Sequence, residues 1–263
     1  MVQKRRTYLQ NIGPKAPSIA GRPKEFRGQQ ANSDQLIYCN RPSHATTVIP
    51  VTLLHPVFGQ FLDDKDMLEP TAPDNKLVRE FSAVMAQIYD TEEERRAEIL
   101  AQLRKWDIDL HGTTIEGTLY RTDADMQHKG DRYGLAEVKN EIGSKGAEPN
   151  AQAAAYYLES TRRRAVDCPK SPLPCFLLYI FGEDLQFTFP CVTQTIVVRP
   201  VYWVWWCGME PSTHCASAFY RSAVAFPLLR WSIAEGHCTT PCCPAKSSSF
   251  SAGLLREHTT HYQ

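Results

Sequence analysis

Two ionisable residues follow an apolar pair, Leu135 and Ala136, and a third lies upstream of them. Glu137 and Lys139 are separated by one valine, and Asp125 precedes them. Burying an unpaired charge costs on the order of several kcal/mol, so these groups need a partner or a bound ion. Two carboxylates with water are the hard oxygen ligands that Mg²⁺ or Mn²⁺ prefers. A lysine beside them can polarise a water or neutralise charge on a phosphoryl group, which points to phosphodiester chemistry.

Two adjacent strands are expected to position these side chains. Residues 133–140 read as a strand, on which alternation puts Glu137 and Lys139 on one face. A preceding strand at 122–128 carries Asp125, and turn residues rich in glycine and aspartate join the two into a hairpin. The two carboxylates are therefore expected to converge on one metal ion.

A helix after the hairpin supplies two more candidates. Pro149 suits the first turn of a helix that runs to about Arg164. Gln152 and Tyr156 lie at i and i+4 on it and share one face, from which they could orient a metal cluster or contact a phosphate.

The whole pattern resembles the PD-(D/E)XK restriction-endonuclease-like fold. The residues that carry the resemblance are Asp125, the tripeptide from Glu137 to Lys139, and Gln152-x-x-x-Tyr156, which is similar to the downstream motif of the RecB-like nuclease branch. More closely, residues 122–157 resemble the N-terminal nuclease-like region of many fungal proteins that also carry a kinase-like domain, a set related to Crinkler-type effectors. The resemblance covers roughly residues 55–185.

The resemblance implies an α/β core and a metal-dependent nuclease acting on DNA. Asp125, Glu137 and an upstream helix carboxylate would hold Mg²⁺ or Mn²⁺; Glu80 is the first choice for that carboxylate, with Glu94 and Glu116 behind it. Ala124 stands where the motif has proline. The Gly-rich loop, H-R-D and D-F-G motifs of a kinase are absent from the sequence.

Each candidate also has a structural interpretation. Asp125, Glu137 and Lys139 could form a cross-strand ion pair on a surface hairpin, worth at most about 1 kcal/mol. Gln152 could face solvent and Tyr156 could be a core aromatic. The neighbouring Asp123, Asp131 and Glu141 are assigned to turn, strand-edge or outer positions. The corresponding alternative function is a catalytically degenerate nuclease fold that binds nucleic acid or another protein.

Composition sets the broad class. The chain has 263 residues, 43% of them apolar. Lys plus Arg equals Asp plus Glu at 29 each, so the net charge gives no overall positive potential that would by itself indicate binding to nucleic acid or an anionic membrane. No run reaches the roughly 18 apolar residues of a membrane helix. The N-terminus lacks a recognisable secretion signal and the nine cysteines are irregularly spaced, which predicts an intracellular protein of the nucleus or cytoplasm.

The chain divides into three expected parts. Residues 1–35 are rich in Lys, Arg, Pro and Gly and predict a disordered basic arm. Residues 36–185 form the nuclease-like domain. Residues 186–263, rich in Cys, Trp and Pro, are either an aberrant gene end that truncates the fold or a divergent subdomain. Their Cys and His residues lack paired C-x-x-C knuckles, so a zinc site is a minor alternative.

The remaining elements of the domain follow from local patterns. Residues 36–73 predict loop with short extended pieces. A helix from Asp74 carries an apolar stripe, and a second helix begins with the capping box of Thr91 and Glu94. Residues 113–121 predict a strand, and 175–181 predict a buried strand beside the hairpin.

Overall fold

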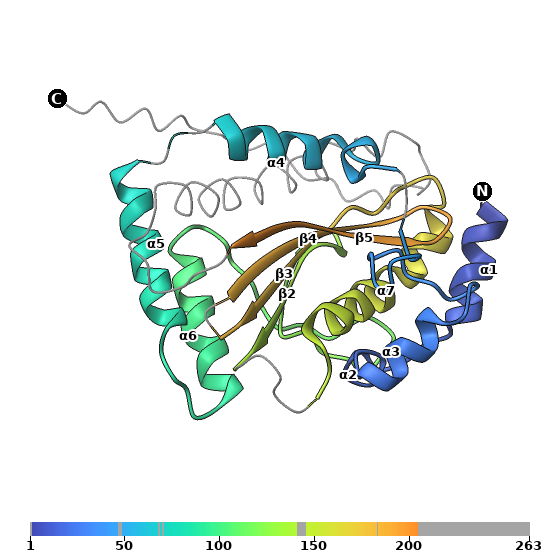
Figure 1. Cartoon of the computed structure of the whole chain (residues 1–263), viewed down its shortest axis with the longest axis horizontal. Helices are drawn as coiled ribbons and strands as arrows, with labels where there is room; N and C mark the ends of the chain where they lie inside the picture. The colour runs from blue at the N-terminus through green and yellow to red at the C-terminus, as the bar shows by residue number, and fades with distance from the viewer. Residues whose placement is uncertain are drawn as a thin grey trace, which may run out of the picture.

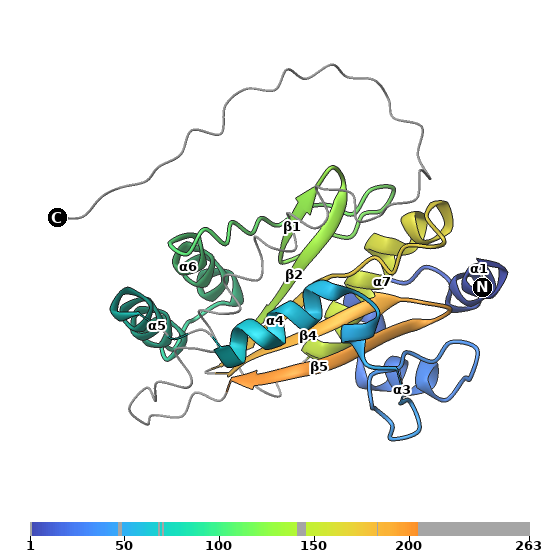
Figure 2. The same ribbon diagram turned by 90° about the horizontal axis from the view of Figure 1, so that it is seen from above.

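The chain folds into a mixed sheet of five strands with helices on both faces, as Figures 1 and 2 show. The computed structural model describes residues 2–46, 49–67, 69, 71–140, 146–182 and 184–204. The helices are α1 (Val2–Ile12), α2 (Pro17–Ala20), α3 (Pro23–Gln30), the short 3₁₀ helix η1 (Val51–Leu53), α4 (Pro56–Met67), α5 (Ala72–Met85), α6 (Glu92–Arg104) and α7 (Pro149–Asp167). The strands are β1 (Ala124–His128), β2 (Asp131–Lys139), β3 (Phe176–Phe181), β4 (Asp184–Val192) and β5 (Ile196–Val204).

The sheet has the order β1-β2-β3-β4-β5. Strands β2 and β3 are parallel and are joined by the crossover helix α7, whereas the other neighbouring pairs are antiparallel. Parallel strands need such a crossover, because a tight turn reverses the chain. The expected hairpin, the following helix and the buried strand beside the hairpin are confirmed, and the fold is mixed α/β.

The β1–β2 hairpin closes through a tight turn and contains a bulge. Lys129 and Gly130 both have positive φ, 51° and 85°, which is the backbone of the primed turns whose twist suits a hairpin. The pairing register then shifts between Met126 and Gln127. Such a shift exchanges the faces of one strand relative to the other, because side chains alternate with a period of exactly two.

The core lies on both faces of the sheet. On one face, α4, α5 and α6 pack apolar side chains such as Phe58, Phe81 and Leu103 against Phe176 and Phe189 of the sheet. On the other face, α7 and the N-terminal helices bury a second cluster that includes Tyr8 and Tyr157. Figure 2 shows α5 and α6 on one side of β2 and α7 with α1 on the other. The hairpin is thus held between two helical layers.

The first 35 residues differ from the expected disordered arm. They form α1, α2 and α3, and Tyr8 and Leu9 of α1 are buried. Arg5 is 3% exposed and donates hydrogen bonds to the backbone carbonyls of Thr193, Cys168, Ser171 and Val192. The composition predicted an arm because charged residues and prolines dominate it, but this arginine is satisfied by carbonyls that only the folded sheet brings together.

Two further segments depart from expectation. Residues 113–121 form a tight turn rather than a strand, because Gly117 adopts a φ of +75° and Ile115 N–H donates to the carbonyl of Tyr120 at 2.8 Å. Residues 36–73, expected as loop, contain η1 and α4, whose Phe58 and Phe61 are fully buried among aromatic rings of β3 and β4. Burial against the sheet, rather than local propensity, explains α4.

The expected domain boundary at residue 185 falls inside β4. Strands β4 and β5 extend the sheet to Val204, so residues 186–204 belong to the same core. The alternatives for the rest of that segment, including a zinc site from Cys207 onward, lie outside the described residues. Among the described helices, none is both long and apolar enough to cross a bilayer.

Candidate functional site

Glu137 is the most deeply buried charged side chain of the candidate site. It lies near the end of β2, next to Tyr179 of β3, and is 0% exposed. Apart from the ammonium group of Lys139, which lies 2.8 Å from Oε1, no described residue donates a hydrogen bond to either of its carboxylate oxygens. Buried carboxylates are nearly always hydrogen-bonded or paired. The carboxylate of Glu137 is therefore a candidate ligand for a bound cation.

Asp123 is the carboxylate that faces Glu137. Ala124 pairs with Ala136, so continuing the register places Asp123 opposite Glu137. The backbone N–H of Val138 donates to Oδ2 of Asp123 at 3.1 Å. Its other oxygen, Oδ1, lies 3.6 Å from the guanidinium of Arg96 on α6. The bulge in the hairpin produces this arrangement, because an unshifted register would put Asp123 opposite Ala136, on the other face.

Lys139 lies between two carboxylates. Its ammonium nitrogen is 2.8 Å from Oε1 of Glu137 and 3.0 Å from Oε1 of Glu92. Glu92 is the first residue of α6, where a negative charge also suits the helix dipole. The lysine side chain is 13% exposed, so the cation stands at the boundary between the buried carboxylates and solvent.

The pKa values of the cluster follow from burial and from the like charges. Burial, and then the charge of Asp123, raise the pKa of Glu137 well above its ordinary value. Burial likewise raises the pKa of Asp123, although Lys139 opposes the shift. Burial alone would lower the pKa of Lys139, but Glu137, Asp123 and Glu92 together raise it. Lys139 is therefore a fixed cation, suited to stabilising negative charge rather than to accepting a proton.

Tyr156 of α7 lies close enough to the acidic cluster to feel its charges, and Gln152, one turn earlier, hydrogen-bonds to Tyr156. Both are buried, with exposures of 5% and 8%. The hydroxyl of Tyr156 donates to the carbonyl of Arg121 at 2.7 Å, and burial together with the charges of Glu137 and Asp123 raises the pKa of this tyrosine to about 12. The solvent-facing alternative for Gln152 is thus not what the structure has. Tyr156 is both a core aromatic and a neighbour of the acidic pair.

Asp125 is placed differently from the expectation. It pairs with Leu135, and its Oδ2 accepts from the hydroxyls of Thr113 and Thr122 at 2.5 Å each. Arg132 Nε lies 3.3 Å from the same oxygen, and the amide of Gln127 donates to Oδ1 at 2.8 Å. Both oxygens of the Asp125 carboxylate thus have partners within this segment. The structure thus gives Asp125 a local network that anchors the segment before β1, while Asp123 occupies the place next to Glu137.

The upstream carboxylates also differ from the expected choice. Glu80 is paired with Lys76 and Lys105 on the outer side of α5 and α6, Glu94 caps α6, and Glu116 pairs with Arg163. None of these has a contact with Glu137 or Lys139 among the described residues. The acid that reaches Lys139 is Glu92, one residue after the N-cap of α6.

The donor set fits a hard divalent cation held by two carboxylates. Glu137 offers two oxygens, of which Oε1 lies 2.8 Å from Lys139 and Oε2 has no donor among the described residues, and Asp123 stands beside it. Within the described part of the chain, no group of three or more His, Cys, Asp and Glu residues is arranged around one metal position. Mg²⁺ keeps several waters and is often held through one or two carboxylates, so a two-carboxylate site is sufficient for it.

The pairing register of the hairpin, which the sequence pattern does not give, is what distinguishes Asp123 from Asp125. Asp123 and Asp125 share one face of a strand, so alternation could not choose between them. Arg96 and Glu92 lie on a helix whose charges were already explained by capping and the helix dipole. Their proximity to the acidic pair is a tertiary relationship between α6 and the end of β2.

Comparisons of this chain with protein-family models, with curated proteins and with solved structures find no match. The class that the geometry defines is therefore limited to a mixed α/β protein with a buried acidic pair and an adjoining lysine.

Proposed function

We propose that this protein is a metal-dependent, nuclease-like enzyme that hydrolyses phosphodiester bonds in DNA. The observation that carries the proposal is the buried carboxylate of Glu137, which has the Lys139 ammonium group as its one donor among the described residues and Asp123 beside it. The resemblance of this segment to the PD-(D/E)XK fold supports the same chemistry. Helix α7 follows the β1–β2 hairpin and leads to β3, which is parallel to β2. This order of elements is consistent with the resemblance.

The residues have separate tasks in this proposal. Asp123 and Glu137 would hold Mg²⁺ or Mn²⁺, which supplies Lewis acidity toward a phosphate oxygen and a water when bound. Lys139, a partly exposed cation, donates to the attacking water or to the phosphoryl oxygens, on which negative charge grows. Tyr156 and Gln152 support the buried side of the pair from α7, and the Val138 N–H fixes the orientation of Asp123.

A cleavage assay tests the proposal. Purified protein is incubated with linear, circular and single-stranded DNA in Mg²⁺ or Mn²⁺, next to the variants Lys139→Ala and Glu137→Gln. Loss of a charged group that acts on the transition state should reduce the rate by at least about 100-fold. Equal cleavage by wild type and both variants would contradict the mechanism, because a contaminating nuclease is indifferent to these residues.

A degenerate nuclease fold that binds nucleic acid or protein is the second candidate. The observation that favours it is that Glu137 is 0% exposed and Lys139 is engaged by two carboxylates, so neither group is free in this arrangement. That candidate predicts DNA binding without cleavage and no Mn²⁺ stabilisation of the wild type that Glu137→Gln removes. A ligand selective for the native state must raise its stability, so a melting curve with and without Mn²⁺ separates the two functions.

A further inference from the structure

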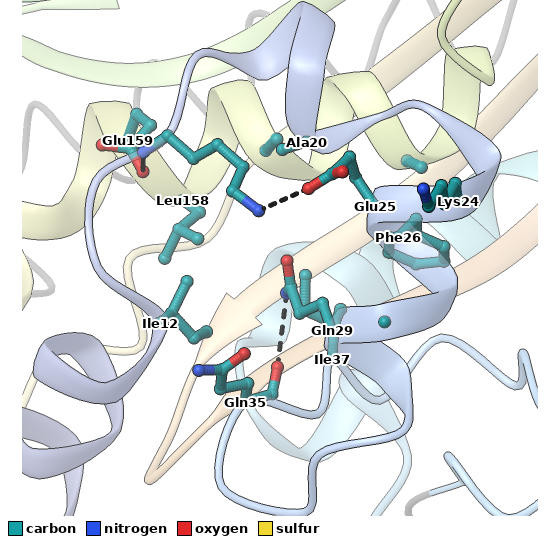
Figure 3. Close-up of a pocket in the computed structure, with 14 residues that line it drawn as sticks. Ile12, Ala20, Lys24, Glu25, Phe26, Gln29, Gln35, Ile37, Leu158 and Glu159 are labelled. Atoms are coloured by element: carbon teal, nitrogen blue, oxygen red, sulfur yellow. Dashed lines mark hydrogen bonds and ion pairs between the residues drawn. The ribbon is translucent and has the colours of Figure 1, made fainter.

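A cavity of about 340 Å³ lies between the N-terminal helices and α7 (Figure 3). Its apolar walls include Ile12 of α1, Phe26 of α3 and Ile37 on one side, with Ala155 and Leu158 of α7 on the other. Small-molecule sites are concave, mostly apolar and start at roughly 300 Å³, so this cavity has room for one small ligand.

Polar groups surround the apolar part of this cavity. Lys15 and Glu25 form an ion pair at 3.0 Å, and Lys24 stands next to Glu25 on α3. Figure 3 shows Glu25 and Gln29 on α3, across the cavity from Leu158. Both members of the Lys15–Glu25 pair are about two-fifths exposed, so the pair is at the mouth and can exchange partners with a ligand. The lining thus carries two ammonium groups, Lys15 and Lys24, and two carboxylates, Glu25 and Glu159, of which Glu159 is paired with Arg162 at 2.6 Å.

Two amide side chains on the wall have oxygens available to a ligand. The amide nitrogen of Gln29 donates to the carbonyl of Gln35 at 3.3 Å, and that of Gln35 donates to the carbonyl of Asn11 at 2.8 Å. These bonds fix both amides by their nitrogen atoms. Their side-chain oxygens accept no hydrogen bond from the described residues and are left to meet N–H groups of a bound molecule.

The combination selects a ligand by its chemistry. A long acyl chain needs a deep apolar cavity, whereas this one is small and lined by charges and amides. A heterocycle with N–H groups fits the apolar walls and the amide oxygens, and an attached phosphate fits the two lysines. We propose that this cavity binds a nucleoside monophosphate, with the base between Phe26 and α7 and the phosphate at Lys15 and Lys24. The choice of a nucleotide among such anions rests on the proposed function, because hydrolysis of a terminal phosphodiester bond of DNA releases a deoxynucleoside monophosphate.

The cavity adjoins the candidate nuclease site through α7. Ala155, on the cavity wall, lies between Gln152 and Tyr156 in the sequence of that helix. Gly21, at the end of α2, is so close to α7 that an added Cβ would lie 2.9 Å from Cα and Cβ of Gln152. The N–H of Glu148 also donates to the Gly21 carbonyl at 2.8 Å. A nucleotide bound here thus bridges the N-terminal helices and the helix that supports the acidic pair.

Calorimetric titration of the full chain with three probes, in the absence of divalent metal, tests the site. The probes are deoxyadenosine monophosphate, deoxyadenosine and 2-deoxyribose 5-phosphate. The phosphorylated nucleoside should bind at least tenfold more tightly than either fragment, because only it engages both the amides and the lysines. No measurable binding of deoxyadenosine monophosphate overturns the proposal. Equal affinity for a fragment also overturns it, since one half of the site would then play no part.

A matched pair of variants on α3 locates the bound molecule. Lys24→Ala removes a cation from the mouth of the cavity and should weaken the nucleotide about tenfold. Arg27→Ala removes a cation from an exposed position of the same helix that does not line the cavity, and should change the affinity less than twofold. Equal losses in the two variants would show general charge attraction and would contradict the site. Circular dichroism melting of both variants checks that they are folded.

The variant Lys139→Ala keeps the two proposals apart. It should bind deoxyadenosine monophosphate as tightly as the wild type, because Lys139 does not line the cavity. If the wild type cleaves no DNA but binds the nucleotide with the expected lysine dependence, the cavity proposal stands and the nuclease proposal falls. If the wild type cleaves DNA in a Lys139-dependent manner but binds no nucleotide, the cavity proposal is wrong.

Discussion

Asp123 lies across the hairpin from Glu137, and the N–H of Val138 holds its carboxylate there at 3.1 Å. Two buried carboxylates next to each other repel, and the pKa of each is raised by burial. Lys139 lies 2.8 Å from Glu137 and Arg96 lies 3.6 Å from Asp123, but Lys139 is shared with a third carboxylate, Glu92. A bound divalent cation would neutralise the negative charge that remains on these carboxylates.

Metal binding should depend on Asp123 rather than on Asp125. Asp123→Asn and Glu137→Gln should each abolish the rise in melting temperature caused by Mn²⁺, because each removes a ligand charge. Asp125→Asn should lower stability by roughly 3 kcal/mol, since it leaves Arg132 without its buried partner, yet keep the Mn²⁺ effect. Melting curves of the three variants with and without Mn²⁺ provide the measurement. Loss of the Mn²⁺ effect in Asp125→Asn alone would restore the assignment made from sequence.

The stability of the metal-free protein should fall as the pH rises above about 4.5. The pKa of Glu137 is raised in the folded protein from its ordinary value of 4.5, so the unfolded chain loses this proton first. The contribution of protonated Glu137 to the free energy of unfolding is complete below pH 4.5. It is lost as the pH rises through the pKa of Glu137 in the folded protein. Urea unfolding in EDTA from pH 4 to 8 should show this slope, and Glu137→Gln should flatten it. An identical slope in the variant would assign the pH dependence to other groups.

Removing Lys139 should destabilise the protein through the carboxylates it leaves behind. Lys139→Met should cost about 3 kcal/mol near neutral pH, because Glu137 then loses its paired cation while Arg96 remains only at Asp123. The double variant Glu137→Gln/Lys139→Met should recover much of this loss. Urea unfolding of the four proteins of this cycle measures the coupling. Additive losses in the double variant would mean that the two side chains do not interact.

The N-terminal helices should contribute to global stability rather than form a free arm. Arg5→Ala should lower the free energy of unfolding by about 3 kcal/mol, since four buried or partly buried carbonyls lose their donor. The neighbouring Arg6 is exposed, so Arg6→Ala should change stability by less than about 0.5 kcal/mol. Limited proteolysis should cleave near residue 15 in the first variant only. Equal behaviour of the two variants would favour the disordered arm.

Two glycines of the N-terminal region should respond in opposite directions to alanine. Gly21→Ala should cost about 1–3 kcal/mol, because the added methyl would meet backbone and Cβ atoms of α7 at 2.9 Å. At Gly28, in α3, an added Cβ meets nothing within 4 Å, so Gly28→Ala should stabilise the helix by about 0.5–1 kcal/mol. Thermal melting of both variants checks this pair. A neutral Gly21→Ala would mean that α2 does not pack on α7 as described.

Local patterns in the sequence were sufficient for much of the central fold. The capping box of Thr91 and Glu94 begins α6 as expected, and the helical stripe that ends near Met85 belongs to α5. The turn at Lys129 and Gly130 joins β1 to β2, and the apolar run at 176–181 is the parallel strand β3. These features depend on contacts within a few residues, so neighbouring side chains alone encode them.

The same patterns predicted that Glu137 and Lys139 share one face of a strand and that Gln152 and Tyr156 share one face of α7. They could not decide which aspartate joins this group, because Asp123 and Asp125 have the same parity and only the bulged register selects between them. Nor could they place Arg5 or α4, whose hydrogen-bond acceptors and aromatic partners come from strands more than a hundred residues away. The sequence alone thus determined the local elements and the kinds of chemical group, whereas long-range packing decided which groups meet.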